Sequence, residues 1–174
     1  FFLIATQNPI EYEGTFPLPE AQVDRFLVKT SLGYPSFDGE KTLLRRRANR
    51  RDRSPTIDPI LSSESIGELQ AVPESVRVDD DLIEYMVQIA RGTRSDRRVD
   101  VGVSPRGTQR LFEVARSKAA LDGRDFVTPD VVRSVAPAAL AHRLVLTPDA
   151  RVDGADKRAI LDEVISEIEV PTLE

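Results

Sequence analysis

The sequence predicts a mostly α-helical protein whose first residues are the remnant of a parallel α/β sheet. Three observations lead to this prediction. An uninterrupted apolar run opens the chain, Ser or Thr stands directly before Pro at two expected helix starts, and apolar residues recur at helical spacing in several later segments. An unbroken apolar run is typical of a strand buried on both faces. The cap-and-proline pair is typical of a helix N-terminus.

The first part of the chain contains the two expected strands. Residues 1–5 form the apolar run, which ends at the polar Thr6-Gln7-Asn8. A short helix is expected over residues 19–24, because Pro suits the start of a helix. A second short strand is expected from Arg25 to about Leu32. These elements are too few to complete a sheet.

We place a domain boundary at Gly33-Tyr34-Pro35, because Gly and Pro together interrupt regular structure. Residues 1–35 are then the sheet remnant and residues 36–174 a helical domain. The opening run has no initiator Met and no basic leader, so we expect a piece of a longer protein, entered within a strand. Isolated strands are marginal in water. We therefore expect residues 1–4 to be poorly ordered or covered by another copy, and the helical part to fold independently.

The helical domain shows start and stop signals along its length. The expected N-caps are either Ser62 or Ser63, together with Ser104 and Thr128. Gly123 and Gly154 are expected stops. Helices are expected over residues 37–50, 62–72, 79–93, 105–121, 129–142 and 156–168, with a short extended piece at 76–78.

Composition excludes several classes of function. The net charge of -5, absence of Cys and single His argue against a disulfide scaffold, a metal centre and a general nucleic-acid binder. The Arg cluster at residues 45–53 is interpreted as a solvated helix face rather than a nucleic-acid patch. No apolar run approaches the roughly 20 residues that span a bilayer, and we expect a cytoplasmic protein. His142 is interpreted as a helix C-terminal residue that favours the negative end of the dipole.

Two candidate site residues lie in the first part of the chain. Asn8 follows the first strand, where open α/β sheets bind ligands, and its amide could orient a water or a phosphate oxygen. An ordinary turn before a proline explains Asn8 equally well. Arg25 follows the short helix and could reach a phosphate on a neighbouring subunit, since guanidinium matches phosphoryl charge. The alternative is an ion pair with Glu20 or Asp24.

The third candidate is Arg106, which follows Ser104-Pro105 at a helix start. A cation at this position opposes the helix dipole, which suggests an anionic partner. That partner could be phosphate or one of the nearby carboxylates.

Together these segments resemble a known family. Residues 2–11 read Phe-Leu-Ile-Ala-Thr-Gln-Asn-Pro-Ile-Glu, and residues 13–26 read Glu-Gly-Thr-Phe-Pro-Leu-Pro-Glu-Ala-Gln-Val-Asp-Arg-Phe. With Gly-Val-Ser-Pro-Arg-Gly at residues 102–107, they closely resemble the MoxR family of AAA+ ATPases. The resemblance covers essentially the whole chain. Magnesium-chelatase and replicative-helicase ATPases share the Asp-Arg-Phe element but not the longer run.

The resemblance implies a role for each candidate. Asn8 matches sensor 1, which orients the attacking water. Arg25 matches the arginine finger, which reaches the neighbouring subunit's γ-phosphate. Arg106 matches the sensor 2 arginine of the lid, and action within its own subunit or on the neighbour both stay open. The implied fold is the end of an AAA+ core (residues 1–35) followed by the helical lid (residues 36–174).

The resemblance also implies ATP and Mg²⁺ as ligands of the parent protein and a homo-oligomeric, hexameric ring. It further implies chaperone-like action on client proteins, including von Willebrand factor A domain proteins. The 174 residues contain no Gly-x-x-x-x-Gly-Lys-Ser/Thr loop. We therefore expect no bound cofactor and no ATP hydrolysis by this chain alone. The alternatives are a non-catalytic helical interaction module and a helicase- or chelatase-type motor. Exposed sheet edges argue against the first, and the lack of a basic, aromatic hairpin argues against the second.

Overall fold

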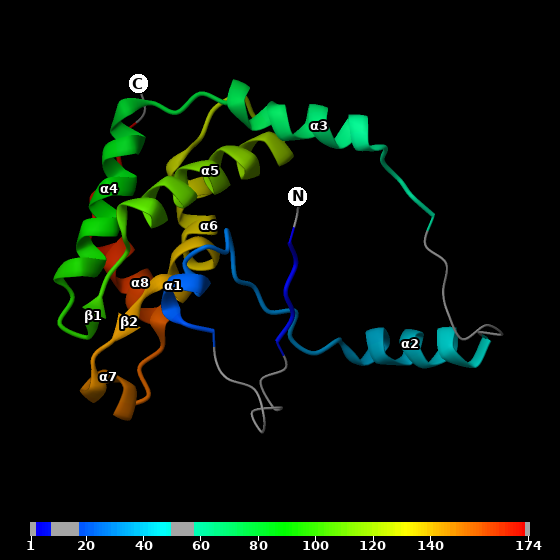
Figure 1. The fold of residues 1–174 in the computed structure, drawn as a ribbon, viewed down its shortest axis with the longest axis horizontal. Helices are drawn as coiled ribbons and strands as arrows, with labels where there is room; N and C mark the ends of the chain where they lie inside the picture. The colour runs from blue at the N-terminus through cyan, green and yellow to red at the C-terminus, as the bar shows by residue number, and fades with distance from the viewer. Residues whose placement is uncertain (1–2, 8–17, 50–57, 173–174) are drawn as a thin grey trace.

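A computed structural model describes residues 3–7, 18–49 and 58–172 of the chain. Within these ranges the protein is predominantly helical, as the sequence predicts, with one small two-stranded sheet (Figure 1). The elements in chain order are α1 (Glu20–Val23), α2 (Phe37–Asn49), α3 (Ser63–Ala71), η1 (Val72–Ser75), α4 (Asp80–Ser95), β1 (Val99–Val101), α5 (Pro105–Leu121), α6 (Pro129–Leu140), η2 (Ala141–Arg143), β2 (Val145–Leu146), α7 (Pro148–Val152) and α8 (Lys157–Ser166).

Four of the longer helices form the compact part of the molecule. Helix α5 packs along α6, while α4 packs against both α5 and α8, and α6 also contacts α8. Helices α2 and α3 extend away from this bundle and contain no buried residue (Figure 1). The helices of this bundle therefore all lie between Asp80 and Ser166.

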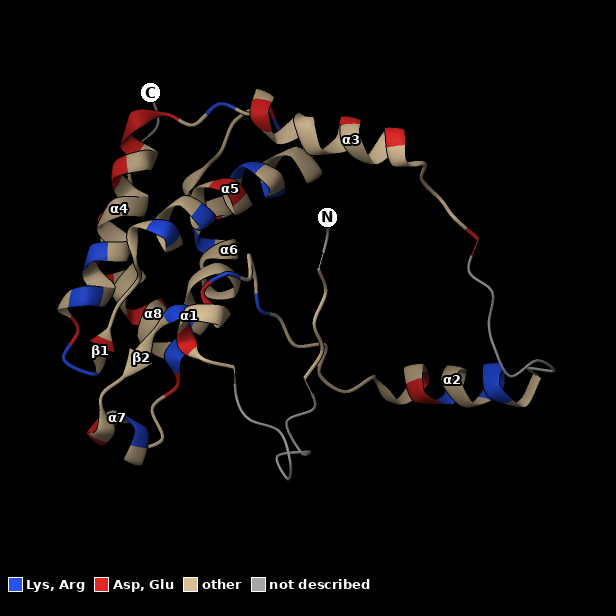
Figure 2. Ribbon diagram, viewed as in Figure 1, with Lys and Arg blue, Asp and Glu red and all other residues tan. Residues whose placement is uncertain are grey.

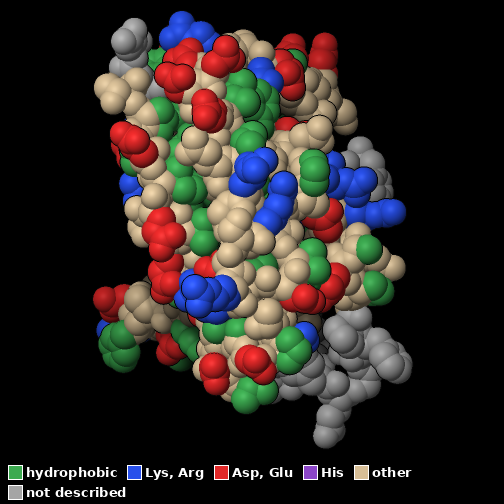
Figure 3. Space-filling model, turned by 90° about the vertical axis from the view of Figure 1, so that its left-hand side faces the viewer, with side chains coloured by type: hydrophobic (Ala, Val, Ile, Leu, Met, Phe, Trp, Pro, Cys, Tyr) green, Lys and Arg blue, Asp and Glu red, His purple; other side chains and the backbone are tan. Residues whose placement is uncertain are grey.

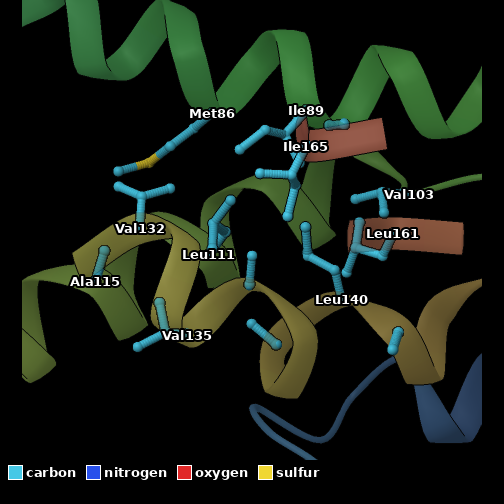
Figure 4. Close-up of a cluster of buried hydrophobic side chains, with 14 of the residues drawn as sticks. Met86, Ile89, Val103, Leu111, Ala115, Val132, Val135, Leu140, Leu161 and Ile165 are labelled. Atoms are coloured by element: carbon cyan, nitrogen blue, oxygen red, sulfur yellow. The ribbon is translucent and has the colours of Figure 1, made fainter. Parts of the chain in front are cut away.

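The core lies where the apolar stripes of these helices meet. Figure 4 shows the side chains of α4, α5, α6 and α8 converging. The fully buried members of this core include Leu82, Met86, Ile89, Leu111, Ala115, Val132, Leu140 and Leu161. Members from one helix are spaced three, four, seven or eight residues apart, which keeps them on one helix face. Each stripe is buried only because another helix covers it.

The expected helix starts are confirmed, with one difference in detail. Ser62 and Ser104 are N-caps whose hydroxyls accept hydrogen bonds from the backbone N–H of Ser65 and Gly107. Thr128 precedes α6, but its hydroxyl makes no cap bond there. It lies instead 3.2 Å from Nη1 of Arg124. Helix α5 ends as expected before Gly123, whose φ of 71° is accessible to glycine without strain.

The two strands expected before residue 35 are not found in the described residues. Residues 3–7 have no regular structure, and Leu3 and Ile4 are 61% and 75% exposed. Residues 25–32 form a turn followed by an extended segment without strand pairing. A strand is defined by a ladder of hydrogen bonds to a neighbouring strand, and no described residue forms such a ladder with these segments. Phe1 and Phe2 lie outside the described residues.

Several elements of the helical part differ from the sequence prediction. The short antiparallel pair of β1 and β2 and the five-residue helix α7 were not expected. The expected extended piece at 76–78 is confirmed by a bridge between Arg77 and Phe126. Helix α6 ends at Leu140 rather than at His142, and a 3-10 turn follows. The domain boundary at residue 35 stays a prediction.

Candidate functional site

Arg25 lies in the turn that follows α1. The backbone N–H groups of Arg25 and Phe26 bond to the carbonyls of Gln22 and Val23, both at 3.1 Å. This turn leaves the Arg25 side chain exposed. Within the part of the chain that the structure describes, Arg25 makes no ion pair. The alternative in which Glu20 or Asp24 neutralises Arg25 is therefore not observed.

Asp24 instead pairs with a lid residue, Arg143. Nε of Arg143 lies 3.0 Å from Oδ1 of Asp24, and the Arg143 side chain is only 2% exposed. Nη2 of Arg143 donates to the backbone carbonyls of Phe26 at 2.6 Å and Asp24 at 3.1 Å. A buried charge is tolerated when it is paired and hydrogen-bonded. This guanidinium satisfies both conditions through the segment that carries Arg25.

Two carbonyl groups at the end of α6 are satisfied at this contact, one of them by the same segment and the other by Arg143. The last carbonyls of an α-helix have no partner inside the helix. The Ala138 carbonyl accepts a hydrogen bond from the N–H of Lys29 at 2.9 Å. The Ala139 carbonyl accepts one from Nη1 of Arg143. Residues 24–29, which we call the finger segment, are therefore docked on the C-terminal end of α6.

His142 lies beside this contact and is held neutral. Burial, with a further contribution from neighbouring Arg143, lowers the pKa of His142 from 6.5 to about 4. Nη1 of Arg143 lies 2.5 Å from Nε2 of His142. A guanidinium can only donate, so this contact favours the neutral imidazole. The position of His142 just after α6 matches the sequence interpretation, but the expected interaction of a cationic His with the helix dipole is wrong.

Arg106 occupies the first turn of α5, which contains no acidic residue. Its side chain is exposed. Over the described ranges no carboxylate forms an ion pair with it. The alternative of a nearby carboxylate partner is thus not observed either. An unneutralised cation at a helix N-terminus is suited to a mobile anion such as phosphate.

The start of α5 is fastened to the end of α4. The buried Thr93 hydroxyl accepts from the backbone N–H of Val103 at 3.0 Å and donates to the Ala90 carbonyl at 2.7 Å. Nε of Arg94 donates to the Val103 carbonyl at 2.8 Å. A Cβ added to Gly102 would lie 2.8 Å from the Arg94 backbone. Glycine is therefore required at position 102 for the backbone to lie this close to Arg94.

Arg143 also touches the first turn of α5. A Cβ added to Gly107 would lie 3.0 Å from Cδ of Arg143 and 2.7 Å from Cγ1 of Val103. Gly107 follows Arg106, and Asp24 precedes Arg25. The two candidate phosphate-contacting arginines are therefore each adjacent to a residue that contacts Arg143. Asn8, the third candidate, lies outside the described residues.

The sequence analysis did not single out Arg143. The available signal was its surroundings, since residues 135–146 contain twelve residues of which only His142 and Arg143 are polar. Arg is rarely buried without a partner. A lone Arg in an apolar run therefore predicts a buried ion pair, although not the identity of the carboxylate.

Charge clusters, metal ligands or membrane-spanning helices among the described residues would indicate other types of site. Basic and acidic residues are interspersed along the ribbon (Figure 2), and their side chains are interspersed on the face of the molecule that Figure 3 shows. Arg45, Arg46 and Arg47 lie on α2, which has no buried residue, in agreement with a solvated face. Within the described ranges there is no group of three potential metal ligands. No helix there has the length and apolarity needed to cross a membrane.

Comparisons with known proteins agree with this arrangement. Residues 1–28, which include Arg25, match the profile of the ATPase family associated with various cellular activities (AAA). Residues 91–164, which include Arg106 and Arg143, match the AAA lid domain. The chain is 37% identical to the Chaperone MoxR1 of Mycobacterium tuberculosis over 180 residues, which cover 98% of this chain and 47% of that protein.

The chain belongs to the MoxR family of AAA+ proteins. It is also 44% identical to the uncharacterized protein YeaC of Bacillus subtilis, over 98% of this chain and 53% of that relative. Among solved structures, a candidate ATPase from Cytophaga hutchinsonii superposes with a TM-score of 0.86 at 30% identity, over 95% of this chain and 53% of that one. This MoxR-type chain thus spans about half the length of the relatives it matches.

Proposed function

We propose that this chain supplies the arginine finger and the lid of a MoxR-type ATPase that hydrolyses ATP in a ring. The observation that supports this most is the state of Arg25. It is exposed on a hydrogen-bonded turn, it forms no ion pair with a described residue, and its neighbouring carboxylate is occupied by Arg143. Arg25 therefore has its full charge available for an external anion.

The chemistry of phosphoryl transfer suits this role. Its transition state spreads negative charge over the phosphoryl oxygens, so catalysis depends on positioning and on charge stabilisation. An arginine supplied by a neighbour adds a planar, permanently charged donor to the reacting phosphate. We propose that Arg25 acts at the neighbouring subunit's γ-phosphate, and that Asn8 orients the attacking water in its own subunit.

ATP and Mg²⁺ are proposed ligands of the longer protein. The 174 residues contain no phosphate-binding loop, and the described residues hold no cluster of three metal-ligating side chains. We therefore assign no phosphate cradle and no Mg²⁺ ligand to these residues. Arg106, exposed at the start of α5, is proposed to contact nucleotide phosphates, in its own subunit or in the next.

The proposed biological role is chaperone-like remodelling of partner proteins. One relative bears the name Chaperone MoxR1, and resemblance to the family adds von Willebrand factor A domain proteins as candidate partners. We also propose that the full-length protein forms a hexameric ring and acts in the cytoplasm. The interspersed surface charges seen in Figure 3 do not favour nucleic acid as a partner.

Steady-state ATP hydrolysis tests the proposal. The full-length ATPase that contains this chain is compared with its Arg25→Ala variant under conditions where ring assembly is verified by sedimentation. We expect Arg25→Ala to lower turnover by about 10³-fold, the contribution typical of arginine fingers, with little change in ATP binding. Turnover equal to the parent in a formed ring would remove Arg25 from the catalytic assignment. The 174-residue chain alone is expected to release no phosphate.

A further inference from the structure

The Arg143 side chain lies between the two segments that carry the proposed phosphate-contacting arginines. On one side it pairs with Asp24, the residue before Arg25. On the other side its Cδ lies against Gly107, the residue after Arg106, where an added Cβ would stand only 3.0 Å away. A Cβ there would clash with Cγ1 of Val103 at 2.7 Å and would also crowd Cδ of Arg143. The side chain is therefore in close contact with both segments.

The bonding of Arg143 fixes the conformation of the finger segment as well as its location. Nη2 donates to the carbonyls of Phe26 and Asp24, on both sides of Arg25, and the guanidinium forms an ion pair with the Asp24 carboxylate. A guanidinium presents its donors in a rigid planar fork, so several simultaneous bonds define direction as well as distance. Lysine could keep the charge at this place but not the fork.

We propose that Arg143 is a positioning residue for Arg25, which it holds in the orientation needed to reach the neighbouring subunit's nucleotide. This inference rests on the proposed function, because it requires Arg25 to act in trans. Arg143 does not touch the nucleotide. Because Arg143 contacts both Gly107 and the finger segment, a displacement of the start of α5 would also displace the finger segment. The lid and the finger of one subunit therefore move together.

The predicted kinetic defect is in turnover and not in ATP binding. A displacement of about 1 Å at a reacting group can cost about 10²-fold in rate, so Arg143→Met in the full-length ATPase should lower kcat by about that factor. The Kd for ATP should stay unchanged. Arg143→Lys should give an intermediate rate. Glu163→Gln, which removes the 2.8 Å ion pair with Arg98 elsewhere on the lid, is the matched control and should leave kcat unchanged.

Subunit mixing separates this role from general damage to the fold. An Asn8→Ala subunit has a disabled site but an intact finger, while an Arg143→Met subunit has an intact site but a misplaced finger. Co-assembly of the two should therefore restore turnover at interfaces where the intact site meets the intact finger. Asp24→Asn, which removes the partner charge at the less buried end of the contact, should behave like Arg143→Met if the latter proves unstable.

A parallel mixture of Arg25→Ala with Asn8→Ala shows which part of the reasoning fails. Restored ATP turnover in both mixtures supports the inference. Restoration with Arg25→Ala but not with Arg143→Met or Asp24→Asn would overturn the role of Arg143 and leave the proposed function standing. No restoration in either mixture would overturn the trans-acting finger, and the inference with it. Wild-type kcat in both Arg143→Met and Asp24→Asn would also overturn it.

Discussion

The Thr93 hydroxyl accepts a hydrogen bond from the backbone N–H of Val103 at 3.0 Å and thereby fixes the segment before α5 to the end of α4. Both residues are fully buried. Replacement of Thr93 by Val keeps the shape but leaves the Val103 N–H without its partner. Because an unsatisfied buried donor costs about 1–3 kcal/mol, we expect the free energy of unfolding to fall by that amount in denaturant titrations.

Ser117→Ala is the matched control for Thr93→Val. The Ser117 hydroxyl also bonds to a helix carbonyl, that of Glu113 at 2.8 Å, but at an exposed position. Water replaces that bond, so the change should be within about 0.5 kcal/mol. Equal losses in the two variants would show that the buried Thr93 contact has no special contribution.

Gly107 should tolerate no larger residue. A Cβ there would lie 2.7 Å from Cγ1 of Val103 and 3.0 Å from Cδ of Arg143. Crowding of this kind typically costs about 1–3 kcal/mol, so Gly107→Ala should lower the free energy of unfolding. Gly67 in α3 has no atom within 4 Å of the same position, and Gly67→Ala should be neutral or stabilise by up to about 1 kcal/mol. A Gly107→Ala variant as stable as Gly67→Ala would contradict the close contact.

The stability of the lid should depend on pH through His142. Burial, aided by Arg143, lowers the pKa of His142 to about 4 in the folded chain. The unfolded chain therefore binds one proton more than the folded chain between pH 6.5 and about 4. The free energy of unfolding gained from neutral His142 is complete above pH 6.5 and is lost as the pH falls through this window. We expect the free energy of unfolding to fall by about 2 kcal/mol between pH 7.5 and pH 5.

The chain contains a single His, so the test of this pH dependence is direct. Hydrogen bonding to Arg98 lowers the pKa of Asp96, so the stabilisation from that carboxylate is lost only at still lower pH. His142→Gln should flatten the dependence between pH 7.5 and pH 5. An unchanged slope in this variant would assign the effect to other groups.

Protection of backbone amides should follow the packing of the bundle. Leu111 and Ala115 are fully buried, whereas Leu3 and Ile4 are exposed and unpaired with any described strand. Opening of an exposed, weakly packed segment costs little free energy. Hydrogen exchange on this chain should therefore be fast at residues 3–5 and slow at residues 111–115. Equal protection at the two segments would show that the first residues belong to a stable sheet.

The helices could be predicted because their signals are local. Ser62 and Ser104 satisfy N–H groups three residues away, and Gly123 ends α5 by its own backbone conformation. The same reasoning could have found α7, since Thr147-Pro148 repeats the device seen at Ser104-Pro105, and the Thr147 hydroxyl caps the helix. The pair β1 and β2 is too short, at three and two residues, to show an alternating pattern.

The site was less predictable because it depends on distant contacts. The exposed positions of Arg25 and Arg106 follow from short motifs that the sequence displays. The pairing of Asp24 with Arg143 joins residues more than one hundred positions apart, and no periodicity or spacing specifies it. The strands expected at residues 1–5 and 25–32 are not found among the described residues for the same reason, since strand formation depends on neighbours that the described residues do not include.

The most direct test of the central claim is ATP hydrolysis by rings in which Arg25→Ala and Asn8→Ala subunits of the full-length protein are co-assembled. Each variant alone should be nearly inactive. If Arg25 acts on the neighbouring subunit, an Arg25→Ala subunit retains an intact site that an adjacent Asn8→Ala subunit can complete, and mixing should restore turnover. Mixed rings that assemble but stay as inactive as either variant alone would contradict the account.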